Sequence, residues 1–256
     1  MSANVLVNPA GGLRYHLRAA RYSRKLWQPF RWAVGEWLLD WQPPETTLVL
    51  VGPSAGYNLQ PFLFERFRRV IALEPDPVAR YLFKRRLAKA PLDERPALEM
   101  LAEDHLLASP ERLGRLLDEH QACVLFSNVI GQLAVLLGAQ DAAHEGFERV
   151  RTGVANAIRG RSWASFHDRF SGSLRPVLEG TLIGDGRLTD AELVEAVYAG
   201  GSAEAEPSKP SELLDHLTAG FFPEELPHAY FSWELEPGSY HLIEGVKSVR
   251  PSAGVA

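Results

Sequence analysis

The residues best suited to chemistry lie between positions 46 and 76, where a glycine-containing turn joins two apolar runs. The turn is Gly52-Pro53-Ser54-Ala55-Gly56, and the second apolar run ends on Glu74. An acidic side chain about 20 residues beyond such a turn can accept hydrogen bonds from the ribose hydroxyls of a nucleotide-like ligand. Glycines at a turn can also serve packing alone, and Glu74 could cap the next helix. Because Asp76 is better placed to cap that helix, the spacing favours ligand binding.

Four more polar side chains follow apolar runs further along the chain. They are Asp104, Asn128 and the adjacent pair His167 and Asp168. Ligands of open α/β sheets bind at the carboxyl ends of the strands, where these residues are expected. His167 and Asp168 could act as a general base or orient an acceptor. The alternatives are a solvated acid at Asp104, an Asx turn at Asn128 and a solvated loop at positions 167–168. We identify no metal-ligating set among them.

The same turn also fits the G-x-S-x-G pattern of a nucleophile elbow. Ser54 would then be the nucleophile of a serine hydrolase, with Asp185 and His241 in a plausible chain order. Two points weigh against this alternative. The turn follows the first strand, so no earlier strand can supply an oxyanion loop, and the elbow does not explain Glu74.

The elements that would position these residues alternate between strand and helix. Strands are expected at residues 47–51, 70–73, 98–101, 124–126 and 163–166, and the first has the continuous Leu/Val run typical of a strand buried on both faces of a parallel sheet. Asp76-Pro77 and Ser109-Pro110 each read as a cap followed by the first residue of a helix. Asn58 is expected to cap a helix with Pro61 at its start, and residues 141–158 are expected to form a helix closed by Gly160. This order predicts a doubly wound, mostly parallel α/β sheet.

The end of the chain breaks the parallel pattern. Residues 229–236 alternate between apolar and polar, Pro237-Gly238 fits the centre of a type II turn, and another strand follows at once. So tight a connection predicts an antiparallel hairpin, which completes a seven-stranded sheet. The insertion before it, residues 172–228, contains a capping box at Thr189 and Glu192. It continues with a flexible connector at 200–210 and a helix over 212–217 capped by Ser211.

The first 45 residues combine long cations with aromatic side chains and end at Pro43-Pro44. The cations are Arg14, Arg18, Arg21, Arg24, Lys25 and Arg31, interleaved with Tyr15, Tyr22, Trp27 and Trp32. One or two helices are expected, with the cations on a solvated face or forming a lid over an anionic or aromatic acceptor. We therefore divide the chain into a helical cap (1–45) and a sheet domain (46–256) that carries a lid-like insertion (172–228).

Composition narrows the class of protein. The chain has 256 residues, 46% of them hydrophobic, enough for one large α/β domain. Its net charge of −5 argues against a nucleic-acid partner. The single cysteine, Cys123, fits a reducing compartment. The start of the chain has no signal-peptide pattern, and polar residues interrupt the only long apolar tract, 122–139. We expect a cytoplasmic protein with no membrane partner.

Five parallel strands followed by an antiparallel hairpin resemble the class I S-adenosylmethionine-dependent methyltransferase family, with its Rossmann-like fold, over about residues 46–249. The turn at Gly52, Pro53, Ser54 and Gly56 is similar to the family's G-x-G-x-G motif. The resemblance implies that this turn meets the amino-acid end of S-adenosylmethionine and that Glu74 takes both ribose hydroxyls. It also implies that Asp104 contacts adenine and that Asn128 lines the path between cofactor and acceptor.

The resemblance has two departures, since Leu50 stands where the family has an acid and Ser54 replaces the middle glycine. An inactive methyltransferase-like binding module is therefore a further alternative. The N/D-P-P-Y/F motif used to methylate the amino groups of bases is absent after the fourth strand, where the sequence is Ser127-Asn128-Val129-Ile130. The favoured function is methyl transfer to a small-molecule acceptor.

Overall fold

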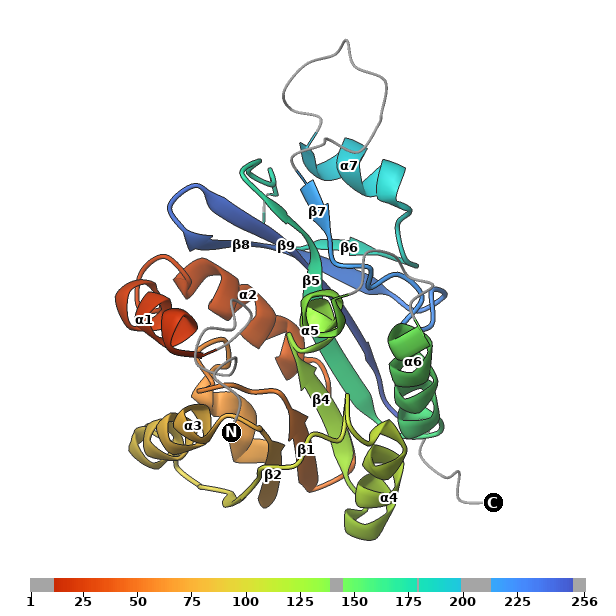
Figure 1. Cartoon of the computed structure of the whole chain (residues 1–256). Helices are drawn as coiled ribbons and strands as arrows, with labels where there is room; N and C mark the ends of the chain where they lie inside the picture. Colours follow the sequence, from red (N-terminus) through yellow and green to blue (C-terminus); the bar gives the residue numbers. More distant parts are fainter. Residues whose placement is uncertain (1–11, 139–144, 179, 199–212, 251–256) are drawn as a thin grey trace.

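A mixed sheet with helices on both faces forms the centre of the molecule (Figure 1). The computed structural model describes residues 12–138, 145–178, 180–198 and 213–250. The nine strands lie in the order β3-β2-β1-β4-β5-β9-β8-β6, and β7 pairs with β5. The strands are β1 (Thr47–Val51), β2 (Arg69–Leu73), β3 (Ala97–Leu101), β4 (Cys123–Ser127), β5 (Trp163–Gly172), β6 (Leu182–Gly184), β7 (Leu213–Asp215), β8 (His228–Glu236) and β9 (Ser239–Ser248).

Helical segments connect most of these strands. They are α1 (Gly12–Tyr22), α2 (Gln28–Leu39), the 3-10 helix η2 (Pro61–Arg66), α3 (Pro77–Lys89), α4 (Pro110–His120), the 3-10 helix η3 (Ile130–Gln132), α5 (Leu133–Leu137), α6 (Glu145–Ile158) and α7 (Asp190–Tyr198). The alternation of strand and helix confirms the predicted doubly wound α/β class.

The first five strands are parallel, as predicted, and β1 lies at their centre. Val51, the last residue of β1, pairs with Leu73 at the end of β2 and with Phe126 near the end of β4. The segments that follow these three strands therefore begin at the same edge of the sheet. This register brings the turn at residues 52–56, Glu74 and Asn128 together.

The antiparallel hairpin at the end of the chain is also confirmed. Strand β9 lies between β5 and β8 and runs antiparallel to both. Glu236 pairs with Ser239 across the turn, and Gly238 has a φ of 80°, as the third position of a type II turn requires.

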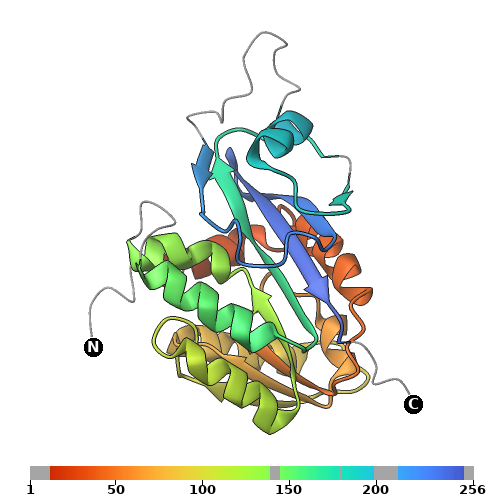
Figure 2. The ribbon, with the colours of Figure 1, turned by 90° about the vertical axis from the view of Figure 1, so that its right-hand side faces the viewer.

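Among the described residues, the two larger of three apolar cores lie on opposite faces of the sheet. In β1, Leu48 and Leu50 belong to the core under α1, α2 and α3, whereas Val49 and Val51 belong to the core under α4 and α6. The alternation follows from the two-residue period of a strand. Figure 2 views the molecule from the α4 and α6 side, and these two helices stand in front of the sheet.

The N-terminal segment forms two helices that are tied to the hairpin. Phe30 stacks on Trp233 of β8 with ring centroids 4.9 Å apart, and the Trp27 ring meets Trp233 edge-on. The Trp27 indole nitrogen donates a hydrogen bond of 2.9 Å to the Leu235 carbonyl. These contacts hold the start of α2 against a strand more than 200 residues away in the sequence.

The predicted helix starts at Pro77 and Pro110 are confirmed, whereas the one capped by Asn58 is not. Asp76 caps α3 by accepting from the Val78 N–H at 2.8 Å, and α4 begins at Pro110, although the Ser109 side chain makes no cap hydrogen bond. The predicted cap at Asn58 is wrong, because the element is a short 3-10 helix capped at Gln60. The amide oxygen of Asn58 instead accepts from the Tyr15 hydroxyl at 3.4 Å. Helix α6 ends at Ile158 before Gly160, as predicted, while the expected start at 141–144 lies outside the described residues.

The insertion adds strands that the sequence did not predict. The capping box is confirmed, since the Thr189 N–H donates to Glu192 at 2.7 Å at the start of α7. The helix predicted over 212–217 is wrong: β7 occupies Leu213–Asp215 and pairs with the far end of β5. The buried Arg169 guanidinium holds Asp215 there with a contact of 2.6 Å. With β6 and β7 the sheet has nine strands within the described part of the chain, where seven were predicted. The connector at 200–210 and Ser211 lie outside the described residues.

Within the described ranges, no helix combines the length and apolar character needed to cross a membrane.

Candidate functional site

A cavity of about 400 Å³ opens at the edge of the sheet where β1, β2 and β4 end. Ligand pockets in proteins typically have volumes of roughly 300–1,000 Å³. Six of the seven residues predicted to bind the cofactor line it: Gly52, Pro53, Ser54, Glu74, Asp104 and Asn128. The seventh, Gly56, is not among its lining residues. Gly12 and Tyr15 of α1 also contribute to the wall.

The turn after β1 depends on two glycines with different surroundings. Gly52 has a φ of 64°, and a Cβ added there would lie 2.6 Å from the Val129 Cβ, so it allows the segments after β1 and β4 to touch. Gly56 has a φ of 69° and an added Cβ would lie 2.8 Å from the Phe83 ring. Gly52 therefore shapes the cavity wall, whereas Gly56 packs against α3.

Glu74 is buried in the cavity wall and its carboxylate is fixed by two main-chain donors. The Ser54 N–H donates to Oε2 at 2.8 Å, and the Asp76 N–H donates to Oε1 at 3.0 Å. Each carboxylate oxygen has a second lone pair that can accept another hydrogen bond. Burial raises the pKa of Glu74 to about 7, although these hydrogen bonds act in the opposite direction.

Asp104 also lines the cavity, and its side chain fixes the segment after β3 through hydrogen bonds to the main chain. Its Oδ1 accepts from the Leu106 N–H at 2.9 Å and the Leu107 N–H at 2.8 Å. Both leucines line the cavity. The segment thus presents an acid and two apolar side chains, a combination suited to a flat heterocycle.

The charge of the lining is one-sided. Four carboxylate residues, Glu74, Asp76, Glu103 and Asp104, line the cavity, and no Lys or Arg is found among its described lining residues. Such a lining favours a ligand with positive charge and disfavours phosphates, which bind to cations or to helix N-termini. After the turn the chain forms a 3-10 helix rather than an α-helix, so the usual phosphate site of a dinucleotide fold is not built here.

Asn128 joins this cavity to β5. It has a φ of 56°, and its amide exchanges two hydrogen bonds with Asp168. Its Nδ2 donates to Asp168 Oδ2 at 3.0 Å, and its Oδ1 accepts from the Asp168 N–H at 2.9 Å. Asn128 therefore lines the cavity and also fixes the Asp168 carboxylate.

The predicted catalytic pair lies within strand β5 and not in a loop after it. The predicted strand ended at residue 166, but β5 continues to Gly172 because β9 and β7 pair with its far end. Neighbouring residues of a strand point to opposite faces, so His167 and Asp168 are separated. Both are buried, which contradicts the solvated-loop alternative.

His167 has apolar and charged neighbours away from the cavity. Its Nδ1 lies 3.0 Å from the Ser165 hydroxyl, its ring is 5.4 Å from the Phe222 ring, and Glu244 is 4.0 Å from Nε2. Burial lowers the pKa of His167 to about 4, and the nearby Glu244 carboxylate only partly offsets it. The ring is therefore neutral near pH 7.

Asp168 lies close to two histidines that the sequence did not point to as its partners. The His241 Nδ1 donates to Asp168 Oδ1 at 2.6 Å, and His216 lies close by. Burial alone would raise the pKa of Asp168, but these histidines and Asn128 together lower it to about 2. No local spacing in the sequence links positions 168, 216 and 241, because β9 and the segment after β7 bring them together only in the folded sheet.

The structure does not bring together the Ser54, Asp185 and His241 side chains that the serine-hydrolase alternative requires. His241 bonds to Asp168, and neither Asp185 nor His241 is among the described residues that line the cavity beside Ser54. The Ser54 N–H donates to Glu74, and no α-helix follows the turn as a nucleophile elbow requires.

Of the aromatic and basic residues in the N-terminal segment, Tyr15 lines the cavity. Burial raises its pKa. Arg18 instead pairs with Glu236 at 2.9 Å, and Arg31 donates to the Ser23 carbonyl. The described part of the segment therefore offers the cavity an aromatic ring rather than a cation.

Comparison with solved structures returns chains with low identity to this one. A SAM-dependent methyltransferase from Aquifex aeolicus is 15% identical over 59% of this chain and 73% of its own, with a TM-score of 0.38. The glycopeptide N-methyltransferase MtfA complexed with S-adenosyl-L-methionine is 16% identical over 86% and 94%, with a TM-score of 0.38. The N-methyltransferase NodS from Bradyrhizobium japonicum WM9, in complex with S-adenosyl-L-homocysteine, is 9% identical over 93% and 99%, with a TM-score of 0.40. No family model and no curated protein matches the chain.

Proposed function

We propose that the protein is an S-adenosylmethionine-dependent methyltransferase that acts on a small-molecule acceptor. The observation that carries this proposal is the position of Glu74 at the end of β2. Its carboxylate is buried in the wall of the 400 Å³ cavity, and the turn after β1 fixes it through the Ser54 N–H. A carboxylate held in this way can accept both hydroxyls of a ribose in one plane.

The charge of the cavity favours this cofactor over other nucleotides. S-adenosylmethionine carries a sulfonium and an ammonium against one carboxylate, so it brings net positive charge to a lining with four acids. NAD and ATP bring phosphates, for which the described lining residues offer no Lys or Arg. Acid-lined walls would repel them.

Each group of lining residues can be assigned to one part of the cofactor. Gly52, Pro53 and Ser54 would meet its amino-acid end, Glu74 its ribose, and Asp104 with Leu106 and Leu107 its adenine. Gly56 would support the turn through its packing on α3. The bound cofactor supplies a methyl group already activated on sulfur.

Alignment and exclusion of water are then the main tasks left to this chain. Asn128 stands between the cavity and Asp168, so we place the acceptor on the side of Asn128, Asp168 and His241. Asp168 would orient the acceptor. His167 faces the Phe222 side of the sheet, and we assign it to packing there.

The departure at Leu50 bears on the alternative of an inactive binding module. Leu50 is fully buried in the core beneath α2 and is not among the described residues that line the cavity. Because this position does not contribute to the cavity wall, a leucine in place of the family's acid leaves the wall unchanged, which supports an active enzyme.

Isothermal titration calorimetry tests the proposal. We expect wild-type protein to bind S-adenosylmethionine but not NAD. Glu74→Ala should weaken binding by at least about a hundredfold, since it removes two charge-assisted hydrogen bonds worth roughly 1.5–3 kcal/mol each. Glu103→Ala, a cavity acid without an assigned ligand contact, is the matched control and should change affinity less. Unchanged affinity in a folded Glu74→Ala protein would refute the ribose assignment, and binding without turnover on any acceptor would favour the binding module.

A further inference from the structure

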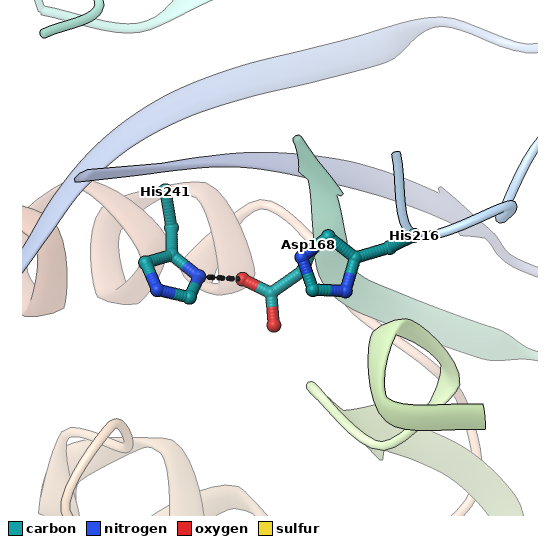
Figure 3. Close-up of side chains that lie close together, drawn as sticks. All are labelled: Asp168, His216 and His241. Carbon is teal, nitrogen blue, oxygen red and sulfur yellow. Dashed lines mark hydrogen bonds and ion pairs between the residues drawn. The ribbon is translucent and has the colours of Figure 1, made fainter. Parts of the chain in front are cut away.

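Asp168, His216 and His241 bring two imidazoles and a carboxylate to one place. They come from β5, from the residue after β7, and from β9 (Figure 3). One potential ligand atom from each lies within 4.8 Å of the other two. Asp168 and His216 are buried, and His241 is partly exposed. We propose that this cluster binds a divalent transition-metal ion.

The donor set indicates the class of metal. Two histidines and one carboxylate form catalytic zinc sites and the facial triads of non-haem iron proteins. Magnesium and calcium prefer oxygen ligands and would gain little from two imidazoles. Three protein ligands leave further coordination positions for water or a substrate.

The surroundings of two of the ligands match those of metal sites. The His216 Nδ1 donates to the Gly131 carbonyl at 2.6 Å, which leaves the Nε2 lone pair of the neutral ring for an ion. The second oxygen of Asp168 accepts from Asn128 Nδ2 at 3.0 Å. Metal ligands usually have such outer partners, because these fix the tautomer of a histidine and the orientation of a carboxylate.

Binding requires only small rearrangements. The His241 Nδ1–H donates to Asp168 Oδ1 at 2.6 Å, and an ion bound between the two groups would displace this proton. Ligand distances of about 2.0–2.2 Å would move the two groups slightly apart. The Ser171 hydroxyl lies 2.8 Å from His216 Nε2, so it must rotate away or join the ligands.

The position of the cluster suggests a use for the ion. Asn128 lies between the cluster and the cavity and touches both. An ion here could hold and polarise an oxygen or nitrogen of the methyl acceptor. This use rests on the proposed function, whereas the metal site itself does not.

Metal titration of the full chain tests the site. After treatment with a chelator, the wild-type protein should bind one Zn²⁺, and Co²⁺ in its place should give visible d–d bands. His216→Gln and His241→Gln should each weaken Zn²⁺ binding by at least about tenfold, since loss of an outer partner alone costs roughly 10- to 100-fold. His120→Gln, at the end of α4 and away from the cluster, is the matched control and should bind as wild type does.

Two further measurements keep the proposal falsifiable if a variant misfolds. Circular dichroism establishes whether each variant is folded, and anomalous scattering from a Zn²⁺-loaded wild-type crystal locates the ion without any variant. Density between Asp168, His216 and His241 would support the site. The proposal would be overturned if the ion were found elsewhere, or if folded wild-type protein bound none of Zn²⁺, Co²⁺ and Mn²⁺. Asp168 and His241 would then be only a hydrogen-bonded pair.

Discussion

At Glu74 two effects act on one carboxyl group in opposite directions. Burial favours the neutral acid, while the N–H groups of Ser54 and Asp76 favour the carboxylate, and burial prevails. The resulting pKa of about 7 places the change of charge in the physiological range. A ligand that donates two hydroxyls needs the carboxylate, so ligand binding and ionisation of Glu74 should be linked.

This linkage predicts pH-dependent cofactor affinity. Because the raised pKa leaves Glu74 protonated at low pH, affinity for S-adenosylmethionine should be highest above pH 7. It should fall by up to about tenfold per pH unit below it. The cofactor's own amino group also titrates, so the comparison is with Glu74→Gln, in which this component should vanish. Calorimetry from about pH 6 to pH 8 measures it; equal slopes in the two proteins would contradict the assignment.

Ser54 is strained in a way that glycine would relieve. Its φ of 49° lies in the left-handed region, which costs roughly 1–2 kcal/mol for a residue with a Cβ. Ser54→Gly keeps the N–H that holds Glu74 and removes only the hydroxymethyl group. We expect unchanged or higher stability in chemical denaturation and cofactor affinity within about threefold of wild type. Loss of a serine-dependent hydrolytic activity would instead revive the nucleophile elbow.

At the scale of elements, the extended β5 joins the sheet to the insertion. Arg169 is buried in the middle of this strand and faces three acids. Its Nη1 lies 2.6 Å from Asp215 at the end of β7, its Nη2 bonds Asp190 at the start of α7, and its Nε is 3.9 Å from Glu244 of β9. One guanidinium thus fixes two elements of the insertion to the sheet.

Removal of this guanidinium should be costly. Arg169→Met removes a buried cation and leaves the buried Glu244 and the partly exposed Asp190 and Asp215 without it. Breaking a buried ion pair typically costs about 3–5 kcal/mol. Arg151→Ala, which removes a partly exposed pair with Glu148 on α6, should cost less than about 1 kcal/mol. Urea denaturation of both variants measures the difference. Similar losses would show that Arg169 does not anchor the insertion.

The elements also explain what the sequence could and could not predict. Short apolar runs and the Asp76-Pro77 start identify the parallel strands and α3, because these signals are local. The far end of β5 and strand β7 have no such signal: SFHDRF and LLD become strands only through pairing with β9 and β5. The prediction of a helix at 212–217 was wrong because it could not take this long-range pairing into account.

In the whole molecule, the cavity residues and the two histidines beside Asp168 come from different parts of the chain. The cavity residues Gly52, Glu74, Asp104 and Asn128 each follow a parallel strand, so their convergence follows from topology and could be predicted. His216 and His241 come from the antiparallel half and the insertion. Their meeting with Asp168 depends on long-range register, which a single sequence does not reveal.

The proposed function depends above all on Glu74 holding the ribose of an adenosyl cofactor in this cavity. A crystal structure of the protein with S-adenosylhomocysteine tests it most directly. The ribose hydroxyls should lie about 2.5–3.0 Å from the Glu74 carboxylate oxygens, with the adenine beside Asp104 and Leu106. A ligand bound elsewhere, or a ribose that contacts other residues while Glu74 keeps only its two main-chain partners, would contradict the account.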